Sequence, residues 1–190
     1  MRRLQREPTA EEAKLWEQEF LSGNDRAMVI VAAARMDALL GEILEKHLIP
    51  ARLRSGEEDQ LLSRMRPLSS FSARIYMARR LGLIAPELED ALHLMREIRN
   101  DMAHEPFSEA SLDSARNLDK VKRLRGLFVE HDIVQFAFEK MGEEIKESPA
   151  LQCRVILIIA LHALTQLYKT VQTIDGSRAW TLKLKRRPST

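Results

Sequence analysis

Apolar residues recur every three or four positions along most of this chain, which is the spacing of one face of an α-helix. In residues 25–48 these positions are Val29, Ala33, Met36, Leu40, Ile43 and Leu44. In residues 86–104 they are Leu88, Leu92, Met95, Ile98 and Met102. Seven glycines and seven prolines are too few for a turn-rich all-β fold, and aromatic residues make up only 5% of the chain. We therefore expect an all-α fold, a multi-helical bundle.

Capping residues and prolines predict where the helices begin and end. Thr9-Ala10-Glu11-Glu12 and Ser55-Gly56-Glu57-Glu58 have the form of a capping box. Asn24 or Asp25, Ser69 or Ser70, and Ser148 before Pro149 are further helix starts. We expect helices over residues 9–21, 25–48, 55–66, 70–81, 86–104, 108–130 (capped by Ser108 or Ser111) and 149–174. Residues 131–138 fit either a strand or a helix, and the alternation in 180–185 allows at most a short C-terminal strand.

The length of 190 residues predicts one domain, with a core over about 10–175 and a basic tail over 176–190. No apolar signal-peptide core follows the arginines near the N-terminus. The most apolar run, 155–161, is shorter than the roughly 20 residues that a membrane span needs. The single cysteine, Cys153, cannot form an internal disulfide, which fits a reducing compartment. We expect a cytoplasmic protein without membrane contact.

The motif Arg99-Asn100-Asp101-Met102-Ala103-His104 closes the helix expected over 86–104. An imidazole such as His104 titrates near neutrality and can move protons, and Arg99 offers a permanently charged fork of donors to a phosphate. Asn100 lies one turn before His104 and can orient its ring if the helix continues that far. Arg99 and His104 are five residues apart and do not share a face of a regular helix. Metal-independent RNA cleavage would therefore need the helix to end near His104, or a second subunit.

The same motif also has an ordinary structural interpretation. Arg99 can pair with a neighbouring carboxylate, from Glu97, Asp101 or Glu105, and His104 can cap the C-terminal end of the helix, where a cation is favoured. Asn100 can bond the backbone of a loop. The residues alone leave both interpretations open, and we favour the non-catalytic one because short motifs recur by chance.

Three segments together resemble the mannitol operon repressor family of bacteria. They are Pro67-Leu68-Ser69-Ser70-Phe71-Ser72-Ala73-Arg74, then Leu81-Gly82-Leu83-Ile84, then the motif over 99–104, and the likeness covers about residues 25–107. This resemblance implies a multi-helical cytoplasmic protein linked to transcriptional control, often without an obvious DNA-reading element.

The spacing from Arg99 to His104 also resembles the HEPN superfamily, whose mark is an arginine, a polar residue, about three further residues and then a histidine. Many HEPN domains are dimeric ribonucleases of toxin or defence systems, and others keep the fold without the activity. The resemblance implies catalytic roles for Arg99, Asn100 and His104 in an active member, with a site completed across a dimer.

Basic residues gather outside this motif and are candidates for binding nucleic acid by counterion release, without sequence choice. They are Arg74, Arg79, Arg80, Lys120, Lys122, Arg123 and Arg125, with further lysines and arginines in the tail. The ordinary alternative, a solvated helix surface, is the one we favour. A DNA-reading helix-turn-helix over 69–104 is disfavoured, because Glu87, Glu89 and Asp90 would face the phosphates.

The five histidines show no paired ligand spacing, and no glycine-rich phosphate loop occurs, so we expect no metal and no cofactor. We expect His162, inside the apolar helix, to be a hydrogen-bonded core residue. The helices over 25–48 and 149–175 carry more apolar surface than one narrow stripe, which predicts a homodimer.

Two functions follow from these patterns. The first is a mannitol-repressor-like transcriptional regulator that acts through protein contacts or weak nucleic-acid binding. The alternative is a HEPN-type metal-independent endoribonuclease, toxin- or defence-like, for which an antitoxin would be the protein partner.

Overall fold

The structure is a computed structural model that describes residues 23–104, 111–128, 130–140 and 147–176. This part contains six packed helices and no strand, so the all-α prediction is confirmed. The helices are α2 (Asp25–His47), α3 (Phe71–Arg80), α4 (Pro86–His104), α5 (Ala115–Phe128), α6 (Asp132–Lys140) and α8 (Pro149–Thr170). The helix expected over 9–21 and the segment 180–185, which the sequence allows to be a short strand, lie outside the described residues.

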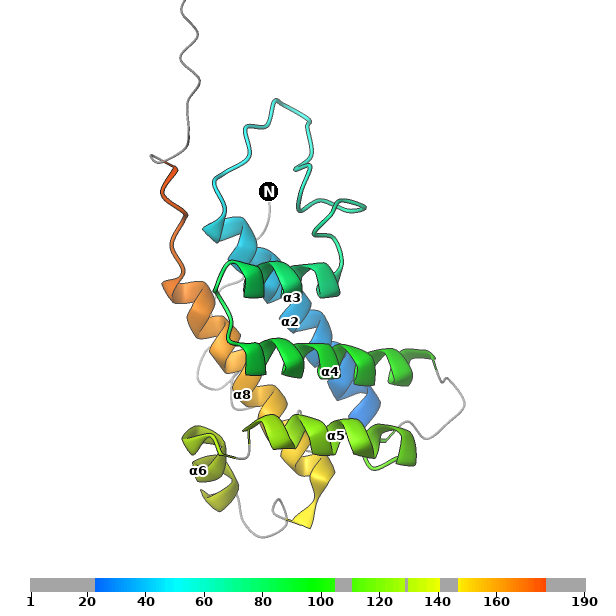
Figure 1. Cartoon of the computed structure of the whole chain (residues 1–190). Helices are drawn as coiled ribbons and strands as arrows, with labels where there is room; N and C mark the ends of the chain where they lie inside the picture. Colours follow the sequence, from blue (N-terminus) through cyan, green and yellow to red (C-terminus); the bar gives the residue numbers. More distant parts are fainter. Residues whose placement is uncertain (1–22, 105–110, 129, 141–146, 177–190) are drawn as a thin grey trace, which may run out of the picture.

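The helices form two layers, with α3, α4 and α5 side by side in front of α2 and α8, which run alongside each other (Figure 1). One hydrophobic cluster draws residues from all six helices. Its largest fully buried side chains come mainly from α2 and α4: Met36, Leu39, Leu40, Ile43, Leu44, Leu92, Met95, Ile98 and Met102. The apolar residues that recur every three or four positions in these two helices therefore form the faces that are buried in the core.

Three helix starts follow the predicted caps. The side chain of Asn24 accepts from the amides of Arg26 and Ala27, at 2.9 and 3.3 Å. The hydroxyl of Ser70 accepts from the third residue after it, and so does that of Ser148, at 3.2 and 3.3 Å. These bonds satisfy amides that the first turn of a helix leaves without partners.

The helix predicted over 55–66 is wrong, because the structure has only turns there. Gly56 adopts a φ of +86°, which a right-handed helix does not allow. The carboxylate of Glu57 accepts from the amide of Arg54 at 3.0 Å, a local bond that is not part of a capping box between Ser55 and Glu58. Local hydrogen bonds thus compete with the helix that the pattern suggests.

Two helices are shorter than predicted, and the ambiguous segment 131–138 is mostly helical, within α6. Helix α5 begins at Ala115 instead of 108, because the hydroxyl of Ser111 donates to Asp25 and also accepts from the amide of Asp113, at 3.0 and 3.2 Å. Helix α8 ends at Thr170 instead of 174, where the chain becomes extended and continues past the C-terminal end of α2.

The segment over 171–176 is fastened to the C-terminal end of α2. The amide of Ile174 donates to the carbonyl of His47 at 2.7 Å, and the hydroxyl of Thr173 donates to the carbonyl of Lys46 at 2.9 Å. The ammonium group of Lys46 donates to the carbonyl of Tyr168 at 2.7 Å. The ends of α2 and α8 therefore satisfy each other's free carbonyls.

A charged cluster at the opposite end of α2 joins three parts of the chain. The guanidinium of buried Arg154 donates to the carboxylate of Asp25 at 2.5 Å and to the carbonyl of Gly23 at 2.6 Å. The other carboxylate oxygen of Asp25 accepts from the Ser111 hydroxyl and the Leu112 amide, both at 3.0 Å. This cluster fixes the segment that enters α5 against α2 and α8.

Among the described residues, α8 alone is long and apolar enough to cross a membrane by length and composition. The prediction from the run 155–161 considered only part of this 22-residue helix. Its core-facing side chains pack against α2, α5 and α6, and 56% of its most apolar window is buried inside the molecule.

Candidate functional site

The motif over 99–104 occupies the last two turns of α4. Pro86 opens the helix, and Glu87 and Glu89 lie in its first turn, where negative charge is favoured. Met102 is fully buried and holds the last turn to the core. The helix remains regular to His104, as the sequence predicts, so the motif has helical geometry throughout.

A regular helix keeps Arg99 and His104 apart. Five residues at 100° each place the two side chains about 140° apart around the axis and about 7.5 Å apart along it. Arg99 follows buried Met95 by one turn and is itself partly buried, whereas His104 is exposed. The described chain therefore does not bring the guanidinium and the imidazole together. Asn100, by contrast, shares a face with His104.

The neighbouring acid of the motif is engaged elsewhere. Asp101 pairs with the ammonium group of Lys120, and its other oxygen lies 3.2 Å from the guanidinium of Arg116, both on α5. It is therefore not the partner of Arg99. The side chains of Arg99, Asn100 and His104 form no hydrogen bond or ion pair with other residues of the described ranges.

Three of the seven basic candidates are held within the chain. Arg74 donates to the Asp37 carboxylate at 2.7 Å and to the Leu68 carbonyl at 2.9 Å, and its side chain is mostly buried. Arg79 lies 3.5 Å from the carboxylate of Glu89, and Lys120 pairs with Asp101 as described. Arg74 thus ties α3 to α2, which is a structural role.

The other four candidates are exposed but do not gather on one helix. Arg80 ends α3, and Lys122, Arg123 and Arg125 lie on α5. Helices α3 and α5 flank α4 on opposite sides (Figure 1). The seven candidates therefore do not form one continuous basic surface.

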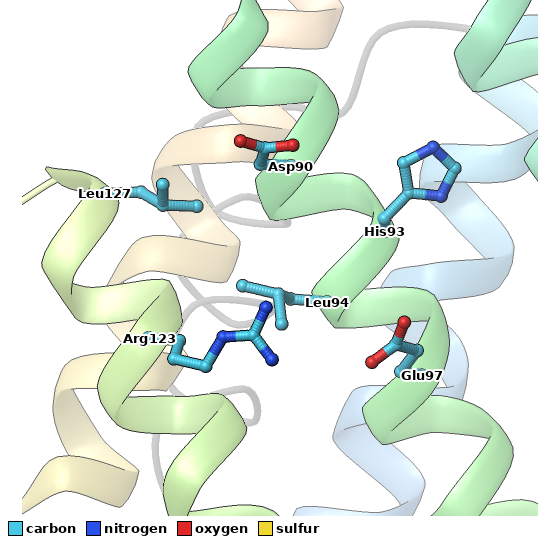
Figure 2. Close-up of a pocket in the computed structure, with 6 residues that line it drawn as sticks. All are labelled: Asp90, His93, Leu94, Glu97, Arg123 and Leu127. Carbon is cyan, nitrogen blue, oxygen red and sulfur yellow. The ribbon is translucent and has the colours of Figure 1, made fainter.

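A shallow hollow lies between α4 and α5. It is lined by Asp90, His93, Leu94, Glu97, Arg123 and Leu127. In Figure 2 the side chain of Arg123 extends from α5 toward Leu94, and the ring of His93 points away from α5. Sequence reasoning missed this hollow, because it depends on how α5 lies against α4; the only signal was the spacing that puts residues 90, 93 and 97 on one face of α4.

His93 has the most unusual environment on α4. Its ring lies 4.6 Å from that of Tyr76 on α3, and its Nε2 atom is buried without a hydrogen-bond partner. Burial lowers the pKa of His93, and the charge of nearby Arg96 lowers it further. Arg96 likewise has a buried Nε without a partner. This environment therefore favours the neutral form of the His93 imidazole over the protonated form.

Two other residues that the sequence analysis singled out are His162 and Cys153. His162 is exposed, so the prediction of a core histidine is wrong; its Nε2 lies 3.3 Å from the amide nitrogen of Gln166, one turn later on the outer face of α8. Cys153 is buried, and burial raises the pKa of its thiol to about 12. Within the described ranges no three His, Cys, Asp or Glu side chains converge as metal ligands would.

Comparison with family models, with curated proteins and with solved structures finds no match for this chain.

Proposed function

We propose that this protein is a non-catalytic regulator of the kind that the mannitol-repressor likeness suggests, acting by contact with a protein partner in the cytoplasm. The observation that carries the proposal is the regular geometry of α4 through His104. This geometry supports the proposal because five residues of regular helix put Arg99 and His104 on different faces, whereas metal-independent RNA cleavage needs both groups at one phosphate. Binding of nucleic acid is a weaker contribution, because the basic candidates are divided between separate helices.

The surface supports contact with proteins. Large apolar side chains are exposed on several elements of the described chain: Val31, Ile49, Leu53, Met65, Tyr76, Ile133, Phe136 and Ile174. Single exposed apolar residues are common on soluble proteins, but methionine and aromatic residues are enriched where proteins meet. The proposal therefore assigns the function to the surface of the bundle.

The test is RNA cleavage by the purified full chain in EDTA. Labelled RNA is incubated with the parent protein, with His104→Ala and with Arg99→Ala, and each variant is checked for unchanged helical content by circular dichroism. We expect no cleavage above the buffer control in any sample. Cleavage by the parent that both substitutions abolish would overturn the proposal.

One observation favours the ribonuclease alternative. Asn100 and His104 lie one turn apart on an outer face, and neither side chain bonds to other residues of the described part. An available imidazole with a side-chain amide one turn away is half of the site that the HEPN resemblance implies. Arg99 of a second copy would have to supply the other half, so this alternative also requires a dimer.

A further inference from the structure

The segment over 48–70 joins α2 to α3 without a helix or a strand. Connections longer than about 12–15 residues without secondary structure are uncommon in compact domains and usually have a function. This α2–α3 loop projects beyond the ends of both helices it joins (Figure 1). Its length and position leave it accessible to a partner.

The second half of the α2–α3 loop is fastened to the core. Leu68 is buried, and Leu61 and Leu62 pack against the hydrophobic cluster. The amide of Leu68 donates to the carbonyl of Leu61 at 2.9 Å. A carboxylate oxygen of Asp59 accepts from the amides of Leu61 and Leu62, at 2.7 and 3.0 Å. The residues between 61 and 68 therefore form a closed turn with a fixed base.

Met65 lies at the tip of this closed turn, with 91% of its surface exposed. Its φ is 61°, a left-handed conformation that is unfavourable for residues other than glycine. The amide of Arg66 donates to the carbonyl of Ser63 at 3.1 Å and holds the turn in this form. A strained backbone that presents an apolar side chain to water indicates a functional constraint.

Two arginines flank this methionine. Arg64 and Arg66 are exposed, and neither forms an ion pair with a carboxylate of the described residues. Methionine is unbranched and adapts to irregular apolar pockets, while arginine binds carboxylates through a planar fork of donors. Both residue types are enriched in protein interfaces.

We propose that Arg64, Met65 and Arg66 anchor a protein partner whose surface has an apolar pocket bordered by carboxylates. The inference rests on the proposed function, since it names the kind of partner that the regulator contacts. The methionine would fill the pocket and the two guanidinium groups would pair with the carboxylates at its edge. Because the turn is already fixed, little conformational entropy is lost on binding.

The composition of the α2–α3 loop favours a protein over other anionic partners. Residues 48–70 contain no aromatic side chain on which a base could stack. The acidic run Glu57-Glu58-Asp59 in the same loop would be repelled by a phosphate backbone or an anionic membrane. A protein surface can offer carboxylates at two points without a continuous negative charge.

The test selects random phage-displayed peptides on the immobilised full chain and measures the affinity of the enriched peptides by calorimetry. We expect peptides that combine aspartate or glutamate with a large apolar residue. Met65→Ser should weaken their binding about tenfold or more, as truncation of an anchor residue does. The double variant Arg64→Glu/Arg66→Glu should weaken it as well.

The chain carries a matched control in the same loop. Leu53 is also flanked by two arginines, Arg52 and Arg54, and half of its surface is exposed. Its φ is not positive, so it lacks the strained turn of Met65. Leu53→Ser should leave the affinity unchanged, and the melting temperature of each variant shows that it folds.

Three results would overturn the inference. The first is that no selected peptide binds the parent more tightly than Met65→Ser. The second is that Leu53→Ser lowers peptide affinity as much as Met65→Ser does. The third is binding of phosphatidylserine vesicles or oligoadenylate RNA that depends on Met65. Peptides that bind independently of Met65 refute the anchor but not the regulator. RNA cleavage in EDTA refutes the regulator, so the two failures are distinguishable.

Discussion

The imidazole of His93 lies between α3 and α4, against the ring of Tyr76. Burial and Arg96 lower its pKa from the ordinary value of 6.5, although the carboxylates of Glu89, Asp90 and Glu97 act in the opposite direction. In the folded protein the neutral ring is therefore favoured. The contribution of His93 to stability is present above pH 6.5 and is lost as the pH falls from there through the lowered pKa of the folded protein, because the unfolded chain binds the proton more readily.

The lowered pKa of His93 predicts a measurable dependence of stability on pH. We expect the melting temperature of the parent to decrease more than that of His93→Gln when the pH is lowered from about 8 to about 5, across the range in which histidine titrates. Thermal unfolding followed by circular dichroism measures the difference. His162→Gln is the control, since His162 is exposed on α8 and should leave the pH profile unchanged. Equal profiles for the parent and His93→Gln would contradict the expectation.

At the scale of the elements, the cluster of Asp25 and Arg154 connects the start of α2 to α8 and to the segment before α5. Both side chains are largely removed from water. Removing one member of a buried ion pair leaves the other charge without compensation, which is more costly than losing an exposed pair.

We expect Arg154→Met to lower the free energy of unfolding by about 3 kcal/mol, because it leaves the carboxylate of Asp25 without its cation. Urea unfolding measures this loss. Glu42→Gln disrupts the partly exposed pair in which Arg35 lies 3.6 Å from Glu42, and should cost less than about 1 kcal/mol. Similar losses in the two variants would show that the buried cluster has no special role.

Local signals account for most of what the sequence predicts correctly. The caps at Asn24, Ser70 and Ser148 could be predicted because each hydrogen bond spans only two or three residues. The failure at Ser55 is also local, since the positive φ of Gly56 and the hydrogen bond from the Arg54 amide to the Glu57 carboxylate lie within the same four residues. A capping pattern alone does not reveal which of these competing bonds forms.

The geometry of the candidate site could likewise be predicted only in part. The separation of Arg99 from His104 follows from their spacing once α4 is known to continue to His104. The pairing of Asp101 with Lys120 and Arg116 could not be predicted, because it depends on the register of α5 against α4. Side-chain contacts between two helices are set by how the helices pack, which the hydrophobic spacing of either helix does not specify.

For the whole molecule, the two-layer arrangement leaves one face of α2 outside the core. Val31 is 52% exposed in the middle of this helix, and Ala27, Ala34 and Ala38 lie exposed on the same side. Small side chains allow helix backbones to approach closely. We expect the homodimer that the sequence suggests to form through this face.

Light scattering with size-exclusion chromatography tests the expectation. The parent should have the mass of two chains, and Val31→Glu should shift it to the mass of one by placing two charges in the interface. Lys122→Glu changes the charge of an exposed residue on α5 and should leave the mass unchanged. A parent of one-chain mass, or a dimeric Val31→Glu, would refute this interface.

The burial of Cys153 also makes the molecule convenient to label. The chain has one cysteine, and at neutral pH its thiol remains protonated inside the bundle, where alkylating dyes react slowly. A second cysteine substituted on the surface would thus be the preferred attachment point without first removing the native one. Fluorophores, spin labels or photo-crosslinkers can therefore be attached along the exposed α2–α3 loop while the interior keeps its original packing.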